Sequence, residues 1–86
     1  PEVNLIEDAI AKALGISPLR SRVQRDPGLT DALGRIVKDL RDTKYEDLTA
    51  DEVVNLIPAG LDSNAIERRF DKGASGEDLV MEWLNG

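Results

Sequence analysis

The chain of 86 residues contains no cysteine and no histidine. These absences exclude disulfide cross-links, thiolate chemistry, zinc sites with the usual ligands and acid–base catalysis by imidazole. Because small secreted domains are usually rich in disulfides, the lack of cysteine also favours an intracellular, cytoplasmic location. We expect neither a metal ion nor an organic cofactor.

Aromatic residues and long apolar segments are scarce too. Tyr45, Phe70 and Trp83 are the whole aromatic set, so the core is expected to be aliphatic, with Phe70 and Trp83 as bulky anchors. No apolar run approaches the roughly 18 residues of a membrane span, and residues 1–14 lack the pattern of a signal peptide. We therefore predict a soluble protein that does not bind a membrane.

The short chain also argues against an enzyme. A domain of this length buries only roughly 60–65% of the surface that its unfolded chain exposes. Its single core leaves little room for a substrate pocket of about 300 Å³, and no pair of carboxylates is flanked by enough apolar residues to suggest burial. We therefore expect no catalytic activity.

The sequence does contain clear signals for helix starts and stops. Three pairs of residues have the spacing of a capping box or a close variant, and four glycines stand where helices should end. The pairs are Asn4 and Glu7, Thr49 and Glu52, and Ser75 and Asp78, and the glycines are Gly15, Gly60, Gly73 and Gly86. This pattern indicates a chain of short helices.

Apolar residues recur at helical spacing in six segments. These predicted helices span residues 5–14, 18–25, 30–44, 50–57, 63–72 and 76–84. No segment has the alternating pattern of a strand. Helices this short pack at steep angles, so we predict an all-α fold, a compact orthogonal bundle of five to six short helices that forms one domain over residues 1–86. The architecture is similar to that of death-fold interaction modules, by analogy alone.

The predicted core lies between the third helix and the C-terminal helices. Its expected members are Leu33, Ile36, Val37, Leu40, Val54, Ile57, Phe70 and Trp83. The last helix should also turn Leu84 inward. Gly34 lies inside the third helix, where it lowers helix stability by about 1 kcal/mol relative to alanine, so we expect a neighbouring helix to approach closely there.

Charge is distributed unevenly along the chain. The net charge of −6 argues against a protein that wraps nucleic acid, because Lys and Arg supply most of the non-specific affinity for phosphates. Residues 12–44 nevertheless carry a net charge of +4, whereas residues 45–86 carry −7 and residues 1–11 carry −3. Such an asymmetry bears on the choice of partners rather than on the fold.

One segment resembles the first half of a helix-turn-helix motif. The residues that carry the resemblance are Ala11, Gly15, Ile16 and Ser17. It implies that the following helix presents Arg20, Arg22 and Arg25 to DNA. The second half departs from the family, because Ser21 and Gln24 occupy positions that are usually apolar. In the alternative interpretation, Gly15 simply ends a helix and the arginines are solvated.

A second segment is similar to the attachment site of acyl and peptidyl carrier proteins. It consists of Gly60, Leu61, Asp62 and Ser63, with Glu67 four residues after the serine. The resemblance implies a phosphopantetheine arm on Ser63, at a helix N-terminus that favours an anionic phosphate. Asn64 departs from the family, which usually has an apolar residue there. In the alternative interpretation, Asp62 or Ser63 only caps a helix.

Two clusters of charged residues each allow a structural and a functional interpretation. The basic stripe consists of Arg35, Lys38, Arg41 and Lys44. Asp31, Asp39 and Asp42 lie at helical spacing from it and can neutralise it, and otherwise the stripe could dock an acidic partner. The acidic cluster consists of Glu46, Asp47, Asp51, Glu52, Glu77, Asp78 and Glu82. It either stabilises helix starts or forms a surface that mimics DNA or binds arginine.

By elimination, we interpret the chain as a non-catalytic protein–protein interaction module, an adaptor, regulator or inhibitor that acts through oppositely charged helical surfaces. The alternatives are a DNA-binding, helix-turn-helix-like or DNA-mimicking regulator, and an atypical acyl or peptidyl carrier protein modified at Ser63. The candidate partner-binding residues are Arg20, Arg22, Arg25, Arg68, Arg69, Asp47, Asp51 and Glu52. Contact between the two charged poles of neighbouring copies would also permit self-association.

Overall fold

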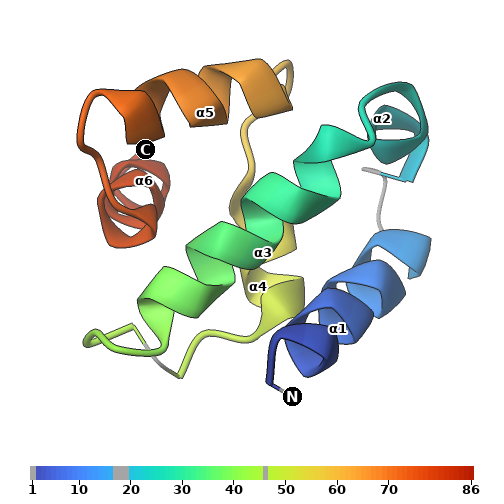
Figure 1. The fold of residues 1–86 in the computed structure, drawn as a ribbon, viewed down its shortest axis with the longest axis horizontal. Helices are drawn as coiled ribbons and strands as arrows, with labels where there is room; N and C mark the ends of the chain where they lie inside the picture. The colour runs from blue at the N-terminus through green and yellow to red at the C-terminus, as the bar shows by residue number, and fades with distance from the viewer. Residues whose placement is uncertain (1, 17–19, 46) are drawn as a thin grey trace.

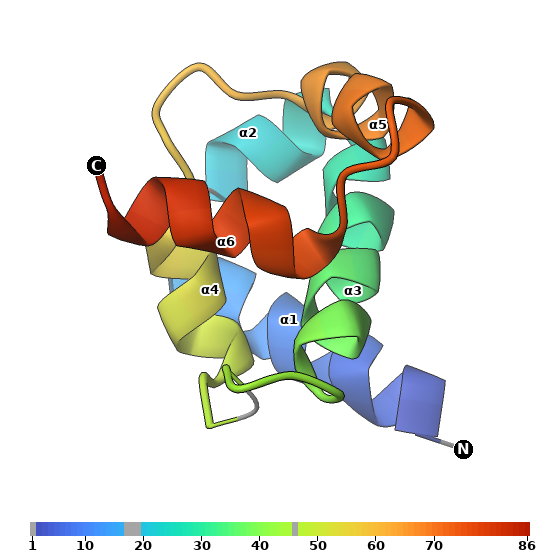
Figure 2. The same cartoon turned by 90° about the vertical axis from the view of Figure 1, so that its left-hand side faces the viewer.

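The structure is a computed structural model that describes residues 2–16, 20–45 and 47–86, with the backbone alone at residues 2–5, 7 and 16. These ranges contain six helices and no strand (Figure 1). The helices are α1 (Glu2–Ile16), α2 (Arg20–Arg25), α3 (Gly28–Leu40), α4 (Ala50–Leu56), α5 (Ser63–Asp71) and α6 (Gly76–Leu84). The all-α prediction is confirmed, and α6 crosses α3 steeply, as expected of an orthogonal bundle (Figure 2).

Helix α3 is the centre of the bundle, because every other helix packs against it. In Figure 1, α1 lies on one side of α3, and α5 and α6 lie on the other. The buried residues of α3 recur every three or four positions and are Leu29, Ala32, Leu33, Ile36 and Leu40. A stripe this wide meets helices on more than one side, which explains how a helix of 13 residues organises the whole fold.

Most of the predicted core is confirmed. Its buried members are Leu33, Ile36, Leu40, Val54, Ile57 and Phe70. Val37 and Trp83 are only partly buried, at the edge of the core. Leu84 is 46% exposed, so the prediction that it points inward is wrong. It is the last residue of α6, at the end of that helix that leads away from the core.

Helices α1 and α3 end at other residues than predicted. Helix α1 continues through Gly15 to Ile16, so Gly15 does not end it. Helix α3 ends at Leu40 rather than residue 44, although no glycine or proline follows. Thr43 explains that end, because its hydroxyl and its backbone N–H both donate to the Leu40 carbonyl, at 3.1 and 3.2 Å. This local turn competes with another helical turn for the same acceptor.

Proline and glycine determine the other ends. Helix α4 ends at Leu56, one residue earlier than predicted, because Ile57 precedes Pro58 and is extended (φ −65°, ψ 123°). Gly60 therefore does not end α4 directly but has a positive φ of 85° in the turn that follows. Gly73 (φ 94°) follows α5 as predicted, in the left-handed conformation that glycine adopts most easily.

The capping predictions hold where the structure tests them. Thr49 with Glu52 and Ser75 with Asp78 form reciprocal capping boxes at the starts of α4 and α6. Asp62 caps α5, since its carboxylate accepts the Ala65 N–H at 2.8 Å. The predicted pair of Asn4 and Glu7 lies outside the side chains that the structure describes.

A close approach of two helices occurs at Gly76, not at Gly34 as predicted. A Cβ at Gly34 would meet nothing within 4 Å, so that glycine accommodates no neighbour. At Gly76, a Cβ would lie 2.8 Å from the Ile36 Cα and 2.9 Å from the Ile36 carbonyl oxygen. The start of α6 thus rests directly on the backbone of α3, and only glycine fits there.

Candidate functional site

The arginines of α2 have different roles in the fold. Arg22 is half-buried, and its guanidinium donates to the carbonyl oxygens of Leu61 and Pro58, the latter at 3.2 Å. It therefore fastens the segment before α5 to α2. Arg20 and Arg25 are exposed. Of the three predicted partner-binding arginines on α2, two present their charge to solvent and the third has a structural contact.

A carboxylate joins the end of α2 to the start of α5. Asp26 accepts the Ser63 N–H at 2.7 Å and the Ser63 hydroxyl at 2.6 Å. These two bonds, helped by the Gly28 N–H and the charge of Arg22, lower the pKa of Asp26 below its usual value. Because Asp26 is held ionised at the N-terminus of α5, it also offsets the positive end of that helix dipole.

The structure does not favour the helix-turn-helix reading. Ala11 is exposed and Gly15 lies within α1, so no turn begins at the glycine, while Ser17 lies outside the described residues. Within the described residues α2 ends at Arg25, directly before Asp26 and Pro27, where a helix that reads a groove would continue. Arg22, one of the three expected DNA contacts, is directed toward the chain itself.

The carrier-like segment also has structural contacts. Asp62 is the N-cap of α5, and Ser63 is the first residue of that helix. The Ser63 hydroxyl is half-buried and donates to Asp26. Attachment of an arm to this oxygen would break that bond, so the geometry supports the alternative interpretation, in which these residues organise a helix start.

The basic stripe on α3 contributes to packing. The Arg35 guanidinium lies 4.0 Å from the centre of the Phe70 ring, so it covers this buried aromatic of α5. Asp39 accepts the Gly76 N–H at 2.7 Å rather than pairing with a basic neighbour. The predicted pairs of Asp31 with Arg35, Arg35 with Asp39 and Lys38 with Asp42 do not form ion pairs in this described part of the chain. Lys44 lies beyond the end of α3.

The acidic pole lies where α4 begins. Asp47, Asp51 and Glu52 are all exposed, whereas Glu46 is outside the described residues. Glu52 belongs to the capping box, because its N–H donates to the Thr49 hydroxyl at 3.1 Å. Asp51 and Glu52 occupy the first turn of α4, where a negative charge is favourable. The pole therefore combines a local structural role with exposed negative charge.

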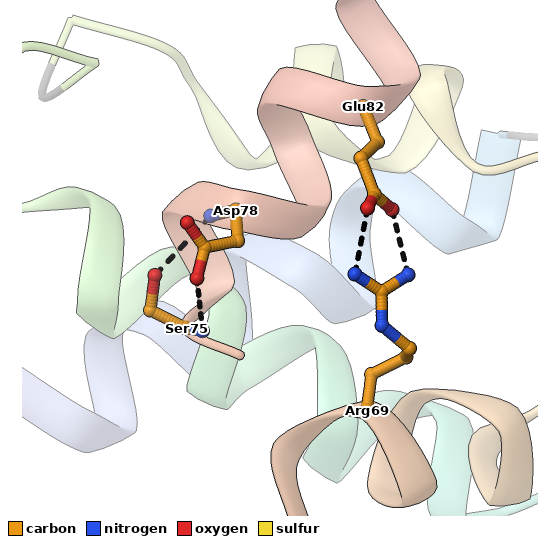
Figure 3. Close-up of polar contacts among 4 residues, drawn as sticks. All are labelled: Arg69, Ser75, Asp78 and Glu82. Carbon is orange, nitrogen blue, oxygen red and sulfur yellow. Dashed lines mark hydrogen bonds and ion pairs between the residues drawn. The ribbon is translucent and has the colours of Figure 1, made fainter. Parts of the chain in front are cut away.

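On α5, Arg69 is paired and Arg68 is exposed. Arg69 donates to both carboxylate oxygens of Glu82 on α6, at 2.7 and 2.6 Å (Figure 3). This bidentate bond lowers the pKa of Glu82 and raises that of Arg69. One turn before Glu82, the Ser75 N–H donates to Asp78 at 2.8 Å and lowers the pKa of that carboxyl (Figure 3).

An apolar groove lies beside this ion pair, between α5 and α6. Its volume is about 280 Å³, and its lining residues are Leu61, Ala65, Ile66, Arg68, Arg69, Lys72, Leu79 and Trp83. Ile66 and Leu79 are almost fully buried and form the apolar floor. Trp83 is half-buried and leaves part of its ring accessible in the wall. We call this feature the α5–α6 groove.

Sequence reasoning identified Arg68 and Arg69 but missed Lys72 and the accessible position of Trp83. Lys72 lies four residues after Arg68 and three after Arg69, so the three cations share one face of α5. That spacing was readable in the sequence. The exposure of Trp83 was not, because it depends on how far α5 lies from α6.

The described residues contain neither a cluster of metal ligands nor a membrane-spanning helix. No three acidic side chains converge as a metal site requires. No helix there is long and apolar enough to cross a membrane. Comparisons of the chain with models of known families, with curated proteins and with solved structures found no match.

Proposed function

We propose that the protein is a non-catalytic interaction module, an adaptor, regulator or inhibitor that binds another protein through oppositely charged helical surfaces. One observation carries the proposal. The α2 helix, with exposed Arg20 and Arg25, lies at the opposite end of the molecule from the start of α4, with exposed Asp47 and Asp51 (Figures 1 and 2). Separated charge of this kind steers association and fixes the orientation of a partner.

The fold anchors the backbone of the basic pole, which consists of the exposed Arg20 and Arg25 on α2. Arg22 and Asp26 tie α2 to the segment that leads into α5. Arg20 and Arg25 are therefore presented from a backbone that is held at two points, which reduces the entropy that a partner must overcome on binding. Arginine suits this role because its planar guanidinium can pair with carboxylates through two hydrogen bonds.

An affinity capture from the native source, read by mass spectrometry, tests the proposal. The informative variant is the double charge reversal Arg20→Glu and Arg25→Glu, with Arg22 left intact because of its structural contacts. Its matched control reverses Lys12 and Lys38, which are exposed on α1 and α3. We expect the α2 variant to lose the captured partner by about tenfold or more, since like charges facing each other are strongly unfavourable.

A second variant tests the acidic pole. Asp47→Lys combined with Asp51→Lys should release a partner that binds there, while Glu52 is retained because it caps α4. Equal capture by both reversal variants and by the control would contradict the proposal. Thermal unfolding of each variant must show that the fold is intact.

Two measurements distinguish the alternative functions. Salt-sensitive retardation of a DNA duplex, lost in the α2 variant, would replace the proposal with DNA binding. A mass gain equal to a phosphopantetheine group on Ser63, after co-expression with a transferase, would establish a carrier protein. An apparent mass that rises with protein concentration would identify a second copy of the chain as the partner.

A further inference from the structure

The α5–α6 groove is large enough to receive side chains of a partner protein. Its volume of about 280 Å³ lies just below the range of roughly 300–1,000 Å³ that is typical of small-molecule pockets. Its floor is apolar, from Leu61, Ile66 and Leu79, and Trp83 provides an accessible aromatic wall. One or two apolar side chains of a partner would fill such a space.

The charge around this groove is opposite to that of its surroundings. Residues 45–86 contain ten acidic and only three basic residues, and these three are Arg68, Arg69 and Lys72. All three line the groove. Every positive side chain of the acidic half is therefore gathered beside one apolar depression, which is complementary to an apolar segment that carries negative charge.

The positive charge at the groove is only partly neutralised. Glu82 pairs with Arg69, and Asp78 adds a weaker attraction to the same guanidinium. The side chains of Arg69 and Glu82 are 41% and 52% exposed, so their ion pair is open to solvent and contributes little to stability. Arg68 and Lys72 are exposed, and no hydrogen bond or ion pair holds them among the described residues.

We propose that the α5–α6 groove binds an acidic peptide segment of a partner protein. An aliphatic or aromatic anchor of that segment enters the groove against Trp83, and its carboxylates pair with Arg68 and Lys72. Another carboxylate replaces Glu82 on Arg69, so the ion pair in Figure 3 opens when the segment binds. This assignment rests on the proposed function and names the chemistry of the partner.

Trp83 gives a direct readout, because it is the only tryptophan in the chain. The probe is a short synthetic peptide that contains Glu and Asp around a pair of leucines and lacks aromatic residues. One control peptide has Lys in place of the acidic residues, and another has Ser in place of the leucines. We expect the first peptide alone to shift the Trp83 fluorescence in a saturable way, and to perturb amide resonances in α5 and α6.

Variants of the protein then place the binding site. Arg68→Glu combined with Lys72→Glu should weaken the acidic peptide about tenfold, because two rim attractions become repulsions. Glu82→Gln should strengthen binding by about two- to fivefold, since it releases Arg69 and removes a competing negative charge. The control reversal at Lys12 and Lys38 applies the same change of charge elsewhere and should leave the affinity unchanged.

Several outcomes would overturn the assignment. Equal weakening by the groove reversal and by the control reversal would mean that net charge alone governs binding. A response to inorganic phosphate as strong as to the peptide would indicate a simple anion site, and a Trp83 signal that depends on protein concentration alone would indicate a second copy. If the acidic peptide fails while the native partner is still captured through α2, the assignment falls and the proposed function stands.

Discussion

Helices α5 and α6 begin in the same way but are held differently. Each has its first residue bound to a carboxylate at one end of α3, with Asp26 accepting from Ser63 and Asp39 accepting from Gly76. At α5 the contact is half-buried and includes a second bond from the serine hydroxyl. At α6 the glycine is buried, and its missing side chain lets two backbones touch.

Two physical contributions stabilise these helix starts, the carboxylate that accepts the N–H and the packing of backbone atoms. Both carboxylates supply an acceptor to an orphan N–H and a negative charge to the positive end of a helix dipole. Only the contact at α6 depends on close packing of backbone atoms. Serine at the first position of α5 adds a second hydrogen bond to the carboxylate, whereas glycine at the first position of α6 allows close packing of two backbones.

Gly76→Ala should have the largest effect. The added Cβ would lie 2.8 Å from the Ile36 Cα and 2.9 Å from the Asp39 Cβ, so α6 must move away from α3. We expect a loss of about 2–3 kcal/mol of unfolding free energy, typical of overpacking in a core. Urea unfolding measures it. A midpoint equal to that of the parent protein would show that α6 is not held by backbone contact.

Asp39→Ala should be the next most destabilising change, and Asp26→Ala should follow it. The first leaves the N–H of the buried Gly76 without its acceptor, at about 2 kcal/mol, because a donor in a buried residue is costly to leave unpaired. The second breaks two bonds, but water reaches half-buried Ser63, so about 1 kcal/mol is expected. Thermal unfolding of both variants ranks them, and the reverse order would mean that the number of bonds outweighs burial.

Gly34→Ala should have an effect of opposite sign. The position is helical and nothing lies within 4 Å of the added Cβ, so alanine contributes its higher helix propensity without a clash. We expect a gain of about 1 kcal/mol, or about 4–8 °C in the unfolding midpoint of a domain of this size. A loss of stability would indicate a neighbour at α3 and restore the original expectation for Gly34.

Lowering the pH should have the smallest effect on stability, and it tests the contact between Asp26 and Ser63 at the start of α5. Because the pKa of Asp26 is lower in the folded protein than in the unfolded chain, the unfolded chain binds more protons as the pH falls. The stability from Asp26 is therefore present at neutral pH and is lost below about pH 4. We expect the difference in stability between the parent protein and Asp26→Ala to shrink from pH 7 to about pH 2. Asp78 and Glu82, whose pKa values are also lowered, lose their contributions over the same pH range in both proteins, so their loss cancels in this difference.

Local signals predicted the helices well, whereas contacts across the chain escaped prediction. Thr49, Ser75 and Gly73 act on their immediate neighbours, and their roles were readable from spacing alone. The choice of Gly76 over Gly34 as the contact point depends on where α6 crosses α3, which no local pattern encodes.

The candidate site divides in the same way. The charges of Arg20, Arg25 and Arg68 were predicted, and they are exposed. The contacts of Arg22 with Pro58 and Leu61 were not predicted, because these residues lie 36 and 39 positions away. The α5–α6 groove was missed for the same reason, since its walls come from helices whose separation is a tertiary property.

The two carboxylates at the ends of α3 have a consequence for molecular recognition. Asp26 and Asp39 are 13 positions apart in the chain, as are Ser63 and Gly76, which bind them. At 1.5 Å per residue, α3 separates the origins of α5 and α6 by about 20 Å. Adding or deleting one residue in α3 would turn one attachment point by about 100° relative to the other. The length of this central helix thereby sets the spacing of α5 and α6 and the shape of the groove between them, even though none of its own side chains lines that groove.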